Sequence, residues 1–116
     1  MQTQSEDQLQ AQCYQWFHNT YPQHRGKLWH VPNGGSRDIR EAQKFKAMGM
    51  LKGVHDLHLY INKQLYTFEL KVGSNKLSQE QVKWKATMTS EGAICYEIRD
   101  FETFEQAIRS ICDNIV

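Results

Sequence analysis

Cysteines are scarce in this 116-residue sequence, and their pattern excludes several classes of protein. The three thiols, Cys13, Cys95 and Cys112, are odd in number and form no C-x-x-C pair. Neither a disulfide framework nor a zinc ribbon is therefore indicated. We expect all three to be buried, reduced thiols.

Long apolar runs are also missing. No stretch approaches the roughly 20 apolar residues that a membrane-spanning helix requires. The N-terminus is polar, without the charged lead and apolar segment of a secretory signal. We expect no membrane association, and the reducing cytoplasm as the location.

Only two prolines and seven glycines are present, and no linker, repeat or low-complexity segment interrupts the chain. A hydrophobic content of 40% is sufficient for a sheet covered by helices. We expect one compact domain that spans residues 1–116.

The formal charge is only +1, yet charges of one sign are clustered. Positions 37–52 carry five cations against two acids, and positions 71–85 carry four against one, whereas the last twenty residues carry five acids against two cations. A surface polarised in this way suits a phosphate backbone that approaches one side. Ordinary solvated helix faces are the alternative.

Hydrophobic periodicity and capping residues predict eight elements. Helices are expected after Ser5, after Ser36 (to about Met48), after Ser78 and after Asp100. Strands are expected at 27–31, 55–61, 65–72 and 93–98, with a turn at 62–64 joining the second and third. The order α-β-α-β-β-α-β-α predicts an α/β fold with a central mixed sheet flanked by helices.

Two acids stand out on this framework. Asp56 lies at the start of one predicted strand, and Glu69 lies on the next, with Lys71 two residues beyond it. Alternation along a strand directs Thr67, Glu69 and Lys71 to one face. Carboxylates suit Mg²⁺ or Mn²⁺, and a nearby lysine can orient or deprotonate an attacking water. The pattern indicates hydrolysis of phosphodiester bonds.

Two other interpretations remain open for these residues. Glu69 and Lys71 could simply be a pair on a solvated strand face. In an unrelated α/β domain, the acids would form a structural salt-bridge network with Lys71 or Lys52. Burying such charges on a central strand without a partner or metal is unfavourable, which favours the functional interpretation.

The arrangement Gly53-x-x-Asp56, strand, turn, Glu69-x-Lys71, followed by a helix that begins near Ser78 with Gln81, resembles the PD-(D/E)xK nuclease superfamily. More narrowly it resembles the VRR-NUC domain, the virus-type replication and repair nuclease. Residues 5–10 and 32–35 extend the resemblance to roughly residues 5–110. The chain departs from the family at His55, where proline is usual before the metal-binding aspartate.

The resemblance implies a restriction-endonuclease-like fold and a Mg²⁺- or Mn²⁺-dependent DNA nuclease. It implies a metal held by Asp56, Glu69 and the backbone carbonyl of Leu70, with Glu6 as a further ligand, and catalysis by Asp56, Glu69, Lys71 and Gln81. Glu6 and Gln81 each have an alternative role in starting a helix. A catalytically inactive DNA-binding module of the same fold is the alternative function.

We expect DNA to be selected by structure, at a Holliday junction, flap or end, because no base-reading helix is evident. Analogy with small family members suggests a homodimer of phage or bacterial origin that acts in repair, recombination or replication. The candidates for contacts with the DNA backbone are Asn33, Gly34, Arg37, Arg40, Lys44, Lys46 and Lys52.

Overall fold

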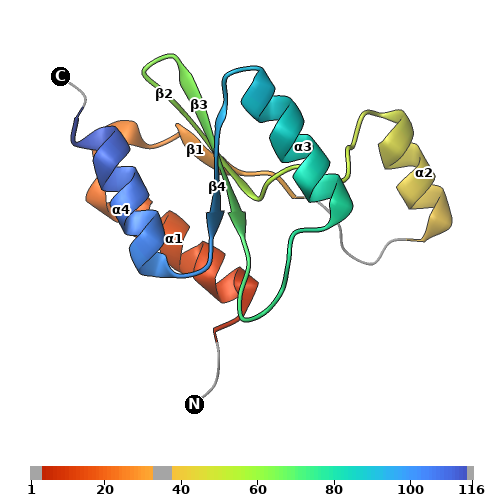
Figure 1. Cartoon of the computed structure of the whole chain (residues 1–116), viewed down its shortest axis with the longest axis horizontal. Coiled ribbons are helices and arrows are strands. Elements are labelled where there is room, and N and C mark those ends of the chain that lie inside the picture. The colour runs from red at the N-terminus through yellow and green to blue at the C-terminus, as the bar shows by residue number, and fades with distance from the viewer. Residues whose placement is uncertain (1–3, 33–37, 115–116) are drawn as a thin grey trace.

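A mixed sheet of four strands forms the centre of the computed structural model, which describes residues 4–32 and 38–114 (Figure 1). The elements are α1 (Glu6–Thr20), a 3-10 helix η1 (Pro22–His24), β1 (Leu28–His30), α2 (Ile39–Ala47), β2 (Leu57–Ile61), β3 (Gln64–Leu70), α3 (Gln79–Ser90), β4 (Ile94–Ile98) and α4 (Phe101–Cys112). The strand order is β1-β2-β3-β4, with β3 and β4 parallel and the other neighbours antiparallel. The predicted fold class is confirmed.

Three helices begin where the sequence predicts. Ser5 and Ser78 each accept a hydrogen bond from the backbone N–H three residues later, and the glutamine at that later position accepts one from the serine N–H. Asp100 caps α4 by accepting from the Thr103 N–H. These bonds satisfy backbone donors that have no partner inside the helix.

The predicted start of α2 is wrong. Asp38, and not Ser36, is the N-cap, since its Oδ1 accepts from the Glu41 N–H at 2.8 Å; Ser36 lies outside the described residues. Aspartate caps as well as serine does, and Asp38 directly precedes the first helical residue, Ile39.

The predicted three-residue turn between β2 and β3 is also wrong. Only Asn62 and Lys63 form the turn, both with positive φ (52° and 64°), and Ile61 pairs directly with Gln64. Two consecutive positive φ angles define the type I′ turn that matches the twist of a hairpin. The register of the whole hairpin follows from this turn.

The hydrophobic core lies between one face of the sheet and helices α1 and α4. Phe68 of β3 packs against Phe104 of α4, with ring centroids 5.0 Å apart, and Cys13 and Cys112 are buried in the same core. Burial raises the pKa of these two thiols to about 12 and about 11. Cys95 is only half-buried, so the expectation of three buried thiols is wrong for this residue.

Helix α3 covers the opposite face of the sheet. Its Trp84 ring packs against the rings of His55 and His58, at 4.8 and 5.5 Å. Thr67 and Glu69 of β3 are almost fully buried, so the interpretation of Glu69 as part of a solvated strand face is wrong. A polar layer is therefore enclosed beneath α3.

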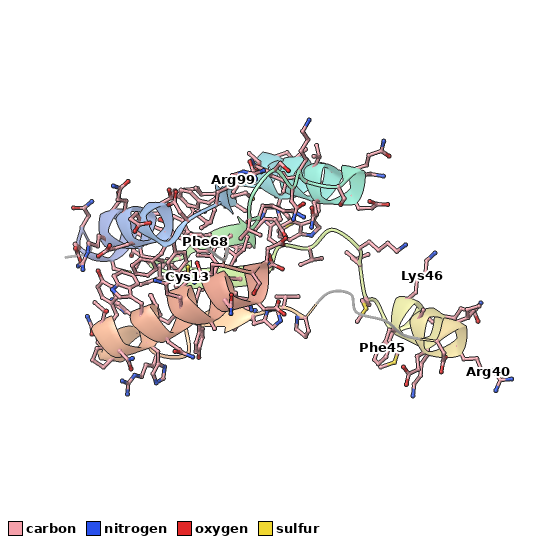
Figure 2. The ribbon with its side chains drawn as sticks, turned by 90° about the horizontal axis from the view of Figure 1, so that it is seen from below. Cys13, Arg40, Phe45, Lys46, Phe68 and Arg99 are labelled. Atoms are coloured by element: carbon pink, nitrogen blue, oxygen red, sulfur yellow. The ribbon has the colours of Figure 1, made fainter. Side chains whose placement is uncertain are left out.

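Helix α2 projects from the rest of the molecule, and Figure 2 shows Arg40 and Lys46 on this projecting helix. None of its residues is buried. Within the described parts of the chain, no helix is long and apolar enough to cross a membrane.

Candidate active site

The hairpin register brings the two acids together. Leu57 pairs with Phe68, so the same register continued by one residue places Asp56 opposite Glu69. Directly opposed residues have Cβ atoms about 4.5–5.5 Å apart. Asp56 Oδ2 also accepts a hydrogen bond from the backbone N–H of Leu70, at 2.9 Å, which fixes the Asp56 carboxyl beside β3.

Glu69 is 1% exposed, and its two oxygens differ. Oε2 accepts from Gln81 Nε2 at 3.3 Å, whereas buried Oε1 has no hydrogen-bond partner among the described residues. Burial, followed by the negative charge of Asp56, raises the pKa of Glu69 to about 9. A buried carboxyl with an unsatisfied oxygen beside a second acid has the chemistry of a cation ligand.

Gln81 has the helix-capping role considered for it and also contacts the acid pair. Its Oε1 accepts from the Ser78 N–H and completes the capping box of α3, while its Nε2 donates to Glu69. One side chain therefore couples the start of α3 to the acid pair.

Gly53 allows the loop before Asp56 to pack against the same helix start. Its φ is +87°, and a Cβ atom there would lie 2.3 Å from the carbonyl oxygen of Glu80. No other residue fits this position without displacing backbone. The glycine of the Gly53-x-x-Asp56 pattern thus has a steric role.

His55 and Thr67 form a second, fully buried link between the Asp56 loop and β3. His55 Nδ1 and Thr67 Oγ1 are hydrogen-bonded at 2.9 Å, and both residues are 0% exposed. Burial lowers the pKa of His55 to about 4, so the ring is neutral at neutral pH. No local sequence signal predicts this contact, because the two residues are brought together only by the hairpin register.

Lys71 and Glu6 both act on Glu69 through charge. The charge of Lys71, a half-buried residue directly after β3, lowers the pKa of Glu69, whereas Glu6 in the first turn of α1 raises it. Glu6 also accepts from Asn75 Nδ2 at 3.1 Å. The first helix therefore brings a third acid toward the pair.

Glu97 of β4 is an acid near the site that no sequence motif marks. It pairs with Glu69 across the β3–β4 ladder. Its carboxylate forms an ion pair with Arg99 at 2.7 Å, which neutralises it.

Across the described residues, no group of three or more His, Cys, Asp and Glu side chains is arranged to hold a metal. Two carboxylates are fewer than such a group requires, although Mg²⁺ generally takes few protein ligands.

The candidate DNA-backbone contacts lie on α2 and in the loop that follows it. Arg40, Lys44 and Lys46 belong to the projecting α2, and Lys52 is exposed in the loop before β2. Asn33, Gly34 and Arg37 lie outside the described residues.

No family model matches this sequence, and no curated protein matches it. Among solved structures, one described as a "VRR_NUC domain protein" superposes with a TM-score of 0.77. The match covers 97% of this chain and 92% of the other, at 20% sequence identity. The chain has the VRR-NUC fold. The VRR-NUC resemblance of the sequence is thereby confirmed at the level of architecture, including the restriction-endonuclease-like sheet.

Proposed function

We propose that this protein is a metal-dependent nuclease that hydrolyses phosphodiester bonds of DNA. The observation that carries the proposal is the cross-strand pair of Asp56 and Glu69, in which one buried glutamate oxygen lacks a partner within the described chain. The VRR-NUC fold also supports the proposal, because it is the fold of a nuclease family.

The residues present fit a hard divalent cation. Asp56, Glu69 and the backbone carbonyl of Leu70 would hold Mg²⁺ or Mn²⁺, with Glu6 as a further candidate ligand. The bound ion would supply Lewis acidity at the phosphate and lower the pKa of a bound water. Glu69 must lose its proton to bind the cation. Its raised pKa keeps the carboxyl protonated at neutral pH, and a bound cation would offset the negative charge of the ionised form.

Lys71 and Gln81 assist the reaction beside the acid pair. The Lys71 ammonium positions the attacking water and offsets negative charge on the phosphate in the transition state. Gln81 holds the Glu69 carboxyl through Nε2. The water oxygen attacks phosphorus and releases a proton to solvent, one phosphorus–oxygen bond breaks, and the departing oxygen is protonated from solvent.

The proposed substrate is branched DNA, bound by a homodimer through its phosphate backbone. Arg40, Lys44, Lys46 and Lys52 are exposed cations that precede the acid-bearing hairpin in the sequence, and Asn33, Gly34 and Arg37 complete the proposed set. Such contacts position DNA but do not read its sequence.

Cleavage of labelled duplex, flap and four-way-junction DNA, with Mg²⁺, Mn²⁺ or EDTA, tests the proposal. Asp56→Asn and Lys71→Ala should each reduce the cleavage rate by more than about 100-fold. Glu105→Gln, on α4 at the opposite face of the sheet, is the matched control and should cleave normally.

Three results would contradict the nuclease: no cutting by the wild type with either metal, cutting in EDTA, or full activity in both site variants. Binding of branched DNA without cleavage would instead identify a catalytically inactive DNA-binding module.

A further inference from the structure

We propose that Arg99, beside Lys71, binds the DNA phosphate next to the one that is cleaved. This inference rests on the proposed nuclease function and deepens it, because it adds a cation from the end of β4 to a site formed by β2 and β3.

Arg99 lies on the same face of the sheet as the acid pair. Its guanidinium contacts the Glu97 carboxylate at 2.7 Å, and Glu97 pairs with Glu69 across the β3–β4 ladder. Paired residues of neighbouring strands point to the same face. Figure 2 shows Arg99 on the side of the sheet away from α1. The ion pair therefore holds Arg99 on the side of the acids.

The register of β3 and β4 also brings Arg99 beside Lys71. Leu70 pairs with Ile98 in this parallel ladder, and the Lys71 N–H donates to the Ile98 carbonyl at 3.0 Å, so the pairing continues to Lys71 and Arg99. Neighbouring strands are about 4.8 Å apart. Two cations are thus adjacent at the carboxyl ends of parallel strands, where open α/β sheets commonly bind their ligands.

The charge balance at this end of the sheet favours an anion. The ion pairs formed by the described residues are Arg99–Glu97 and Arg109–Glu105, so Lys71 has no ion-pair partner in this part of the chain. A divalent cation held by Asp56 and Glu69 would leave the charge of Lys71 uncompensated. A phosphate would supply the missing negative charge.

Arg99 is held ready for such a ligand. Its Nη2 donates to Glu97 and its Nη1 donates to the Gly73 carbonyl at 3.1 Å, which leaves other N–H groups of the guanidinium available. The side chain is 39% exposed, so a ligand can reach it. A planar guanidinium fixed in one place matches the oxygens of a phosphate.

The order of the strands indicates which phosphate Arg99 binds. Asp56 precedes β2 and Glu69 lies on β3, so the cation between them would hold the phosphate that is cleaved. Arg99 follows β4, one strand farther from Asp56. It therefore suits the adjacent phosphate and positions the strand.

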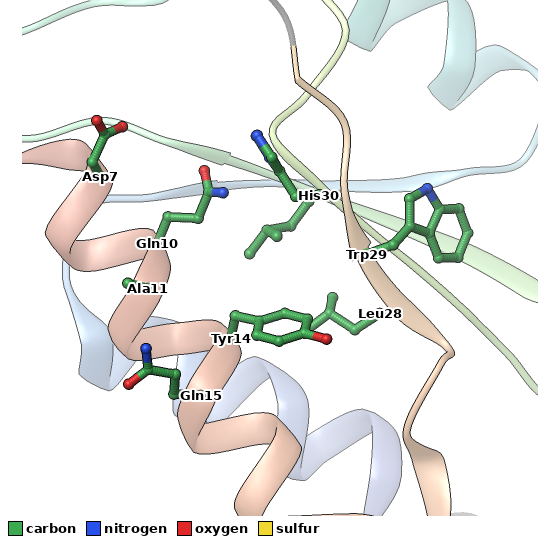
Figure 3. Close-up of a pocket in the computed structure, with 9 residues that line it drawn as sticks. Asp7, Gln10, Ala11, Tyr14, Gln15, Leu28, Trp29 and His30 are labelled. Atoms are coloured by element: carbon green, nitrogen blue, oxygen red, sulfur yellow. The ribbon is translucent and has the colours of Figure 1, made fainter.

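The groove beside α1, between α1 and β1, is a poor site for a phosphate. Its volume is about 620 Å³, and Leu28 and Leu57 of the core face line it. Figure 3 shows Asp7 on α1 and Leu28 on β1 beside this groove. Within the described chain no lysine or arginine lines it, and Asp7 adds a negative charge. The phosphate contact is therefore assigned to the α3 face.

Anisotropy of labelled flap DNA in Ca²⁺ tests the contact. Arg99→Gln should weaken binding roughly tenfold, the effect of losing a charge-assisted hydrogen bond. The slope of log affinity against log salt should also become shallower by about one. Arg99→Lys, which keeps the charge, should retain the slope. Arg109→Gln is the matched control, since Arg109 forms a similar exposed ion pair on α4, at 3.0 Å, and should bind like the wild type.

A second comparison separates phosphate binding from neutralisation of Glu97. Glu97→Gln removes the acid, so Arg99→Gln added to it leaves no unpaired carboxylate. The double variant should still bind DNA roughly tenfold more weakly than Glu97→Gln alone. Equal affinities would show that Arg99 only offsets the charge of Glu97, and would overturn the site.

Neutral methylphosphonate links at successive positions around the branch point locate the phosphate. At one position the wild type should lose roughly tenfold in affinity, whereas Arg99→Gln should lose nothing further. That position should adjoin the mapped cleavage site. Equal losses for wild type and Arg99→Gln at every position would contradict the contact.

Cleavage of the unmodified flap in Mg²⁺ is scored separately. Cutting by the wild type, with Arg99→Gln binding as tightly, overturns the Arg99 site and leaves the nuclease intact. Weaker binding by Arg99→Gln without any cutting by the wild type overturns the nuclease alone. Failure of the wild type to bind DNA overturns both.

Discussion

A single residue, Glu69, makes the stability of this protein depend on pH. Its pKa is raised from 4.5 to about 9, first by burial and then by Asp56. Between these values the folded protein keeps a proton that the unfolded chain has released, so the free energy of unfolding falls as pH rises. The lowered pKa values of His55 and His58 have the opposite effect, since they make the free energy of unfolding rise with pH. This effect is confined to pH values below about 6.5, the pKa of histidine in the unfolded chain.

We therefore predict that, in EDTA, the melting temperature of the wild type falls between pH 6.5 and 8.5. Glu69→Gln should show a flatter profile, because glutamine does not titrate. Mg²⁺ should stabilise the wild type more at pH 8.5 than at pH 6.5, since it binds the ionised carboxylate. Thermal unfolding monitored by fluorescence measures both effects. Parallel profiles for wild type and variant would contradict the assignment.

Gly53 supports a second prediction at the residue scale. Gly53→Ala combines left-handed backbone strain with overlap onto the Glu80 carbonyl, and should destabilise the fold by at least about 2 kcal/mol. Gly26→Ala is the matched control, since Gly26 has a φ of +90° but has nothing within 4 Å of the added Cβ. Gly26→Ala should destabilise the fold by about 1 kcal/mol. Equal costs in urea unfolding would disprove the steric role of Gly53.

The hairpin of β2 and β3 is the element that connects the site residues, and the buried His55–Thr67 bond ties its two ends together. Thr67→Val keeps the side-chain volume but leaves the histidine without this partner, and should cost about 1–3 kcal/mol. The double variant His55→Leu/Thr67→Val removes both polar groups and should cost less than the sum of the single changes. A double-mutant cycle by urea unfolding measures the coupling. Additive costs would show that the bond contributes nothing.

Most elements can be predicted from sequence, because each has a local signal. The capping boxes at Ser5 and Ser78 and the apolar stripe of α4 depend only on neighbouring residues. The predicted start of α2 fails because serine and aspartate two positions apart are equally good caps. The predicted turn between β2 and β3 fails because lysine rarely adopts the positive φ that Lys63 has.

The candidate site is predictable to the extent that it follows from a motif and an alternating strand. Asp56, Glu69 and Lys71 can be identified in this way, and the structure brings their charges together. The His55–Thr67 bond, the Glu97–Arg99 pair and the position of Arg99 beside Lys71 require the register of the sheet. No spacing in the sequence encodes those contacts.

At the scale of the whole molecule, the two faces of the sheet carry opposite charge. The basic segment 71–85 reaches into α3, whereas the acidic C-terminal segment forms α4 across the sheet. Helix α2 adds further cations on an element that buries none of its residues. DNA is thus expected on the side of α2 and α3.

Lys46→Glu should accordingly weaken DNA binding without unfolding the protein. The slope of log affinity against log salt should become shallower by about one for each phosphate that the variant no longer neutralises, while stability changes by less than about 0.5 kcal/mol. Lys63→Glu, at the exposed hairpin turn, is the matched control and should bind normally. Equal weakening by both variants would indicate a general charge effect instead of a specific role for α2.

The two-residue turn at Asn62–Lys63 sets the spacing of Asp56 and Glu69, which lie equally far from its centre on opposite arms of one ribbon. A single inserted residue there would shift the ribbon's pairing and send one carboxyl to the wrong side of the sheet. For protein engineers the same feature is an opportunity. Residues 53–71 form one continuous segment that contains both acids. Transfer of this segment into another antiparallel sheet would preserve the relative positions of the two carboxyl groups.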